Sequence, residues 1–142
     1  MTGGWRAQLD RVRRWHARLA TARNPSDRHD FLYAFFESAF HLRDWLLDAG
    51  AASERDIRTL FEGAEEMRLC RDLANSHKHF SLYDPSQPLP PSEALEFAAG
   101  FGNLDTDTSL VVLSDGKKHD AFELATKVLR SWEAFILSHV KP

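Results

Sequence analysis

The chain has 142 residues, of which 43% are apolar, 27% charged and 11% aromatic, and these proportions exclude a disordered protein. Its single cysteine excludes an internal disulfide and a cysteine-rich zinc module. No apolar run approaches the roughly 18–20 residues of a membrane span, and the N-terminus lacks the apolar segment of a secretory signal. We therefore expect one soluble, cytoplasmic domain over residues 1–142, with no membrane partner.

The net charge of −3 is divided unevenly along the chain. Residues 1–23 hold six arginines and one aspartate, a net charge of +5, which leaves −8 for the remainder. An arginine-rich helix is suited to nucleic acid or to an acidic partner surface. Arg6, Arg13 and Arg14, with Lys78 later in the chain, are candidates for such contacts. The alternative is a solvated helix face whose charge is neutralised by the acidic remainder of the same fold.

Apolar residues recur at spacings of three and four over residues 5–22, which predicts an amphipathic helix. Asn24 and Pro25 suit the cap and the first position of a second helix. This helix should run to about Asp48 and end at Gly50. A polar stripe lies on a different face of it from the broad apolar stripe. The polar stripe holds Glu37, His41, Asp44 and Asp48.

Ser53, with Asp56 three residues later, predicts the start of a short third helix that bends near Gly63. A fourth helix is expected over about residues 64–79, because its apolar residues fall within one arc of the helix. That arc holds Leu69, Cys70, Leu73, Ala74, His77 and Phe80.

The character of the sequence changes at residue 81. Residues 81–91 contain four of the six prolines and cannot form a helix. Alternating apolar residues over 95–101 and a β-branched run over 109–114 predict two strands. The following pair, Asp115 and Gly116, is typical of a tight turn. We therefore expect a small β insertion, a hairpin, between about residues 81 and 118.

Asp120, with Glu123 three residues later, predicts the start of a last helix whose apolar stripe continues to about His139. The expected fold is mainly α: an antiparallel helical bundle of four to five helices, with a small β-hairpin insertion before the last helix. Three of the four tryptophans lie on or beside apolar stripes, so we expect them in the core. These are Trp15, Trp45 and Trp132.

The segment from Cys70 to Phe80 concentrates chemically active side chains between apolar anchors. On a helical wheel His77 falls on the buried arc, whereas Arg71, Asn75 and Lys78 share a neighbouring stripe. Arg71 and His77 are six residues apart, so in a straight helix they point about 120° away from each other and do not touch. They could meet at a ligand in a cleft or across a two-fold interface.

This segment resembles the signature of the HEPN superfamily, which are helical bundles with an Arg, four to six intervening residues and a His. Arg71 and His77 fit that spacing, and Asp72 fits the polar residue often found after the Arg. The chain is also similar to small bacterial proteins with Phe-His-Leu-x-Asp-Trp on one helix and Ala-Asn-x-x-Lys-His on a later one, here residues 40–45 and 74–79. The pattern departs from the superfamily at position 79, where a histidine replaces the Tyr that some toxins carry as a site for antitoxin modification, and in the added hairpin.

The HEPN resemblance implies a metal-independent endoribonuclease of defence or toxin type, which needs no cofactor and works as a homodimer with its two motifs facing each other. His77 would transfer protons near neutral pH, and Arg71 would clamp the phosphate of the RNA. Four residues would support these two: Asp72, Asn75, His41 and Asp44. Many members have lost the activity, so the alternative is a non-catalytic interaction or dimerisation module for a protein partner, such as an antitoxin, or for nucleic acid.

Two other interpretations of the same residues remain open. In the first, His77 is a satisfied core histidine and Arg71 is half of a salt bridge to Glu37, Asp44 or Glu66. In the second, a metal binds ligands drawn from several helices, because His77 and His79 alone would point about 160° apart on one helix. The other ligand types available for such a site are Cys70 and Asp44. Catalysis requires Arg71 and His77 to be exposed in one cleft, whereas the core interpretation predicts them buried and paired.

Overall fold

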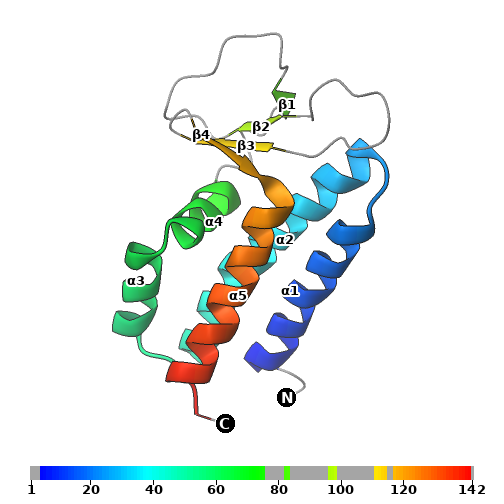
Figure 1. The fold of residues 1–142 in the computed structure, drawn as a ribbon. Helices are drawn as coiled ribbons and strands as arrows, with labels where there is room; N and C mark the ends of the chain where they lie inside the picture. The colour runs from blue at the N-terminus through cyan, green and yellow to red at the C-terminus, as the bar shows by residue number, and fades with distance from the viewer. Residues whose placement is uncertain (1–3, 76–81, 84–95, 99–110, 115–116, 142) are drawn as a thin grey trace.

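A computed structural model describes residues 4–75, 82–83, 96–98, 111–114 and 117–141. Within these ranges the chain is mostly helical, with the strands placed between the fourth and fifth helices (Figure 1). The helices are α1 (Gly4–Thr21), α2 (Pro25–Asp48), α3 (Glu54–Gly63), α4 (Glu65–Asn75) and α5 (Ala121–His139). The strands are β1 (Leu82–Tyr83), β2 (Glu96–Ala98), β3 (Val111–Ser114) and β4 (Lys117–Asp120).

Capping side chains determine where three of the helices begin. At the start of α2, Asn24 Oδ1 accepts a hydrogen bond from the backbone N–H of Asp27 at 2.8 Å. Ser53 Oγ has the same role for α3, at 3.0 Å, and Asp120 Oδ2 has it for α5, at 2.8 Å. Each bond satisfies a backbone donor that the first turn of a helix leaves unpaired. These three predicted helix starts are confirmed.

Glycines mark the ends of α2 and α3. Gly50 has a φ of +64°, a left-handed conformation that glycine adopts without the steric cost of a Cβ. Its N–H donates to the carbonyl of Leu47 at 3.0 Å, so the last turn of α2 is closed by the backbone. Helix α3 ends at Gly63 and α4 begins at Glu65. The bend predicted near Gly63 is therefore a break between two helices.

The helices pack around one common core. In Figure 1, α1 runs toward the sheet, α2 runs back, α3 and α4 lead toward the sheet again, and α5 runs back. α2 packs against α1, α4 and α5, and α5 also packs against α1 and α4. Buried apolar side chains from all five helices form a single cluster. None of the described helices is both long enough and apolar enough to cross a membrane.

Trp132 of α5 lies fully buried in this cluster and joins three helices. Its indole N–H donates to the carbonyl of Ala39 in α2 at 2.8 Å. Its ring packs edge-on against Phe61 of α3 and Phe135 of α5, with both centroid distances at 5.8 Å. A buried indole N–H requires such an acceptor, and the aromatic pairs add packing energy. The prediction of a core position for Trp132 is confirmed.

The corresponding prediction for Trp45 is wrong, since 43% of this residue is exposed. The antiparallel register of α1 and α2 explains the exposure, because Gln8 Nε2 donates to the carbonyl of Ser38 at 2.8 Å. Seven residues beyond Ser38, Trp45 lies level with residue 1, past the point where α1 begins. Trp15 is intermediate: it is partly buried against the core and packs on Phe31 at 5.7 Å.

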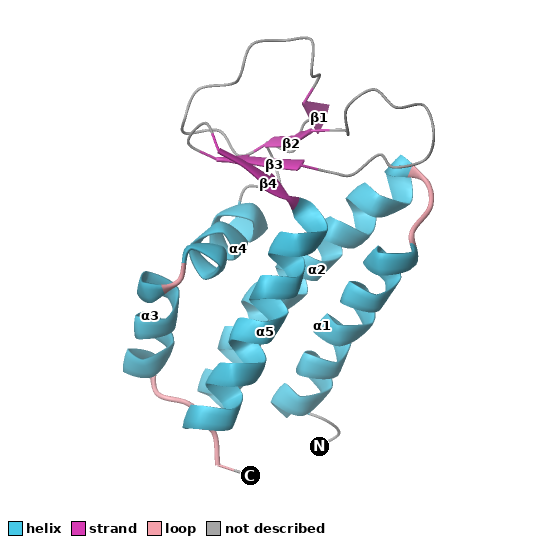
Figure 2. Cartoon of the chain, viewed as in Figure 1, coloured by secondary structure: helices cyan, strands magenta, loops and turns pink. Residues whose placement is uncertain are grey.

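The strands form one sheet in the order β1-β2-β3-β4, next to one end of the helices (Figure 2). β1 pairs with β2 in parallel, and the other two neighbouring pairs are antiparallel. The insertion is therefore not the simple hairpin that the sequence predicts. β1 lies in the proline-rich stretch, and β4 includes Lys117 and Lys118, which follow the expected turn. Neither segment has alternating apolar residues, so the sequence pattern did not mark them as strands.

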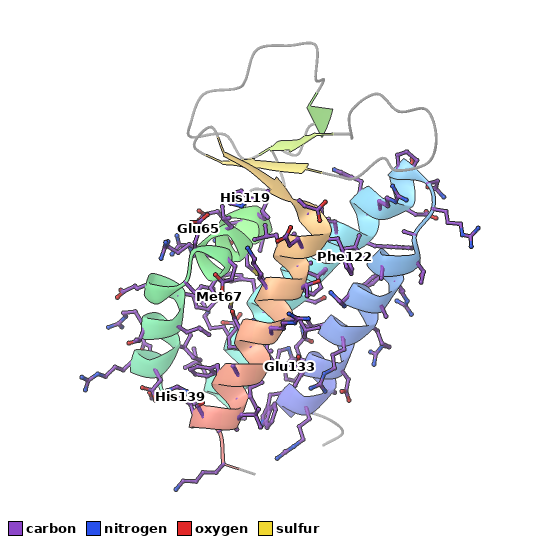
Figure 3. All side chains as sticks on the ribbon, in the orientation of Figure 1. Glu65, Met67, His119, Phe122, Glu133 and His139 are labelled. Atoms are coloured by element: carbon purple, nitrogen blue, oxygen red, sulfur yellow. The ribbon has the colours of Figure 1, made fainter. Side chains whose placement is uncertain are left out.

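A polar contact between described residues links the sheet to the helices. His119 of β4 places its Nε2 3.5 Å from Glu65 Oε1 at the start of α4 (Figure 3). β4 then continues directly into α5, with Asp120 as the last residue of the strand and the cap of the helix. The sheet is thus connected to α4 and α5, the two helices that flank it in the chain.

Candidate functional site

Helix α4 carries the described part of the predicted catalytic segment. Cys70 fixes it against α2, where its Sγ donates to the carbonyl of Phe36 at 3.6 Å. Leu73 and Ala74 on the same arc are also buried. Burial raises the pKa of the Cys70 thiol, so this residue is a small core side chain and not a thiolate nucleophile or ligand.

Arg71 and Asp72 lie on the outer side of α4. Their side chains are 41% and 44% exposed, and Arg71 Nε lies 3.1 Å from Asp72 Oδ1. Asn75, one turn further along, is also exposed. The only ion pair that the described residues give Arg71 is with its neighbour. The core interpretation predicted a salt bridge from Arg71 to one of three acidic residues, and no such bridge is described. These residues are Glu37, Asp44 and Glu66.

The second half of the predicted motif, His77 with Lys78, lies outside the described residues, as does His79. The described helix ends at Asn75, and α4 lies next to the sheet (Figure 1). Arg71 is one turn before that end. The structure therefore places Arg71, Asp72 and Asn75 together on a solvent-facing stripe.

No family model, curated protein or solved structure matches this chain. The HEPN resemblance therefore remains a prediction carried by the motif residues themselves.

His41 and Asp44 lie apart from Arg71 in the described contacts. His41 is exposed and lines a groove between α1 and α2. Helix α4 packs on another flank of α2, where Phe36 accepts the bond from Cys70. His41 follows Phe36 by five residues, which turns it about 140° around the helix axis. Asp44 is exposed and pairs with Arg43 at 3.3 Å, so its described partner is on its own helix.

Helix α1 presents its arginines on two flanks with different surroundings. Arg13 lies on the flank toward α5, where its Nη2 is 2.8 Å from Glu133 Oε2 and its Nη1 is 3.2 Å from Asp10 Oδ1. Figure 3 shows Glu133 on α5. Arg6, on the same flank, stacks over the ring of Trp5 at 4.5 Å. Of the three predicted contact residues on α1, Arg13 therefore already has acidic partners within the fold.

The third, Arg14, belongs to the other flank together with Arg11 and Arg18. Residues at these spacings fall within one stripe of a helix, and all three side chains are exposed. Arg11 donates to Gln8 Oε1 at 2.8 Å, and Arg18 lies over the ring of Trp15 at 4.8 Å. Among the described residues none of the three forms an ion pair. Sequence reasoning selected Arg14 alone, although the helical spacing of all three was visible in the sequence.

A pocket between α3 and α5 offers few polar groups to a ligand. It has a volume of about 360 Å³ and is mainly lined by apolar atoms, with Asp56 and His139 among its lining residues. The His139 ring stacks on Phe135 at 4.5 Å and its Nδ1 lies 3.2 Å from the Phe135 carbonyl. Within the described ranges, no three His, Cys, Asp or Glu side chains form a group that could hold a metal ion.

Proposed function

We propose that this chain is an RNA-directed protein of the HEPN type, which works as a homodimer and cleaves RNA without a metal ion. The observation that supports this proposal best is the position of Arg71. Its side chain is 41% exposed, and among the described residues it pairs only with the adjacent Asp72. A structural arginine would have its charge satisfied in the core, whereas an arginine that receives a phosphate must reach solvent.

The proposed chemistry uses the 2′-hydroxyl of RNA as nucleophile. A histidine can take the proton from this hydroxyl or return one to the 5′-leaving oxygen, since it titrates near neutral pH. An arginine can hold the scissile phosphate through two parallel N–H···O bonds and stabilise the charge that develops in the transition state. In a homodimer two copies of Arg71 and His77 would supply both proton-transfer roles and two cations.

The alternative function is a non-catalytic module that binds a protein or nucleic-acid partner. It is favoured by one observation, the exposed stripe of Arg11, Arg14 and Arg18, which forms no described ion pair. A cationic stripe of this kind attracts polyanions whether or not the chain has a catalytic centre. The two functions differ in their need for Arg71 and His77.

The test is RNA cleavage in excess EDTA, with mixed single-stranded RNA and purified full-length protein. We expect the wild type to cleave and both Arg71→Ala and His77→Ala to lose about 100-fold or more of the rate, as when a transition-state contact is removed. Arg58→Ala is the matched control, because Arg58 is an exposed arginine of α3 paired with Glu54 at 3.4 Å. This variant should cleave like the wild type.

Each variant is first unfolded in urea to show that it still has a cooperative transition. Cleavage retained by folded Arg71→Ala or His77→Ala would contradict the proposed site. The absence of cleavage by every form, including the wild type, would contradict the ribonuclease and favour the binding module. Light scattering on the same samples tests the homodimer, which predicts twice the 16.2 kDa mass of the chain.

A further inference from the structure

A groove of about 310 Å³ lies between α1 and α2, away from the flank of α2 on which α4 packs. Aromatic, cationic and acidic side chains all line it. They include Trp15 and Arg11 from α1 and Glu37, Ser38, His41 and Trp45 from α2. The motif residues on α4 are not among them. This combination of side chains is that of a polar binding groove rather than of an apolar docking face.

The two tryptophans lie toward opposite ends of this groove. Gln8 is level with Ser38, and Trp15 packs on Phe31, so α1 and α2 run antiparallel with a fixed register. In this register the Cα atoms of Trp15 and Trp45 are roughly 20 Å apart along the helices. Helical side chains lean toward the N-terminus of their own helix, so in an antiparallel pair the two indoles lean toward each other. They border the space that the polar side chains line.

Trp45 is the more exposed of the two tryptophans. It is 43% exposed, and no aromatic ring among the described residues packs on it. Trp15, in contrast, lies against Phe31 and beneath the guanidinium of Arg18. An exposed tryptophan at the edge of a cationic groove is the arrangement on which a nucleic-acid base stacks.

The cationic side of the groove is the stripe of Arg11, Arg14 and Arg18. Arg11 lines the groove itself, and the other two continue along the outer side of α1. Arginines without acidic partners are free to contact the phosphates of a strand lying along the groove. Arg13, on the opposite flank of the same helix, is already paired with Glu133 and cannot serve in this way without breaking that pair.

Glu37 on the α2 side distinguishes this groove from a purely electrostatic surface. Burial raises the pKa of the nearby Tyr33, and the charge of Glu37 and its capacity to accept a hydrogen bond from the Tyr33 hydroxyl act in the same direction. A carboxylate has about four acceptor positions, so one such bond leaves it able to accept others. It would repel a phosphate but can accept a hydrogen bond from the exocyclic amino group of a base, as from N4 of cytosine.

We propose that the groove between α1 and α2 binds single-stranded RNA, with a base stacked on Trp45, an amino group of a base held by Glu37, and phosphates along Arg11, Arg14 and Arg18. The inference rests on the proposal that the chain is RNA-directed and adds where the strand lies. It also adds a preference: cytosine, which carries an amino donor at the position that Glu37 reads, should bind better than uracil, which has none.

The test is equilibrium binding, by fluorescence anisotropy, of labelled 2′-O-methyl oligocytidine and oligouridine to the full chain. Trp45→Ala should weaken binding of both about ten-fold, the usual effect of losing one stacked base. Arg14→Ala should weaken both and lower the slope of log K against log salt by about 0.7, because one phosphate contact is lost. Glu37→Gln should remove the preference for cytidine.

Two control variants change exposed side chains that lie outside the groove. Arg13→Ala changes an exposed arginine on the other flank of α1, and Leu137→Ala removes an apolar side chain of α5 that is 87% exposed. Neither should change the affinity. If Arg13→Ala weakens binding as much as Arg14→Ala does, or if Trp45→Ala has no effect, the groove is not the binding surface.

A polyglutamate peptide separates RNA from an acidic protein. Binding of this peptide, lost in Arg14→Ala and unchanged in Glu37→Gln, with no binding of either oligonucleotide, would overturn the proposal in favour of a protein partner. Because a 2′-O-methyl strand lacks the 2′-hydroxyl nucleophile, binding is measured without cleavage. Failure of the ribonuclease assay and failure of the groove are therefore separate results.

Discussion

His16 illustrates how local contacts set the properties of a single side chain in this fold. Its Nε2 lies 2.8 Å from Thr126 Oγ1, and the Thr126 hydroxyl donates to the carbonyl of Phe122 at 2.9 Å. Since that hydroxyl hydrogen is already used, Nε2 of His16 is the donor of the first bond. The ring also stacks on Phe122 at 4.9 Å. These contacts hold the imidazole between α1 and α5.

The surroundings of His16 predict a stability that falls in mild acid. Burial lowers the pKa of His16, with Arg130 acting in the same direction and Glu133 against it. The folded pKa therefore lies below the unfolded value of about 6.5, and near that pH the unfolded chain binds more protons. The free energy of unfolding should be largest above that pH and fall as the pH drops toward the folded pKa.

Urea unfolding of the wild type and of His16→Gln between pH 5.5 and 7.5 measures this effect. Glutamine can donate the same bond to Thr126 but has no proton to gain, so the variant should lose less stability over this range. His41→Gln is the control, because His41 is exposed on α2 and its change should leave the pH dependence as in the wild type. Equal slopes for all three proteins would contradict the role given to His16.

Single residues were predictable from the sequence when their surroundings lay on their own helix. Cys70 and Trp132 lie on apolar arcs, and both are buried as expected. Trp45 also lies beside an apolar stripe, yet it is exposed, because it lies beyond Gly4, the first described residue of α1. Helical periodicity gives the direction of a side chain but not the length of the neighbouring helix.

At the level of whole elements, Asp120 has two structural tasks. It is the last residue of β4, paired with Val111 of β3, and its side chain caps α5. Asp120→Ala should lower the free energy of unfolding by about 1 kcal/mol, the usual effect of losing an N-cap. Asp120→Asn keeps an oxygen that can accept from Glu123, so it should cost much less. Urea denaturation of both variants measures the difference, and equal losses would show that the cap is not the source.

The helices were predictable because their start and end signals are local. The side chains of Asn24, Ser53 and Asp120 each accept a hydrogen bond from the backbone N–H three residues later. Gly50 follows the end of α2 and has a positive φ. The sheet was predicted less well, because the partner of a strand can be far away in sequence. Leu82 of β1 pairs with Phe97 of β2, and a strand of two residues is too short to show a sequence pattern that predicts this pairing.

For the molecule as a whole, the candidate site also depends on contacts between residues that are far apart in the sequence. The sequence predicted a basic first helix but could not separate its two flanks. What separates them is Glu133, which is 120 residues from Arg13 in the chain and 2.8 Å from it in the structure. The same holds for His41, which was predicted to support Arg71 and His77 and lines the groove between α1 and α2. Only the packing of distant helices decides which charges remain available to a ligand.

The shared core predicts that the helical part of the chain unfolds as one unit. Trp132 contacts α2 and α3 from α5, and Trp15 of α1 packs on Phe31 of α2. A domain of this size with a single cluster should have no populated intermediate. We therefore expect variants that retain either Trp132 or Trp15 as their only tryptophan to show fluorescence transitions in urea that coincide with the loss of helical circular dichroism in the same variant. If the fluorescence of Trp132 changed at a lower urea concentration than that of Trp15, while the circular dichroism curves of the two variants coincided, α3 would separate from α1 and α2 before they unfold.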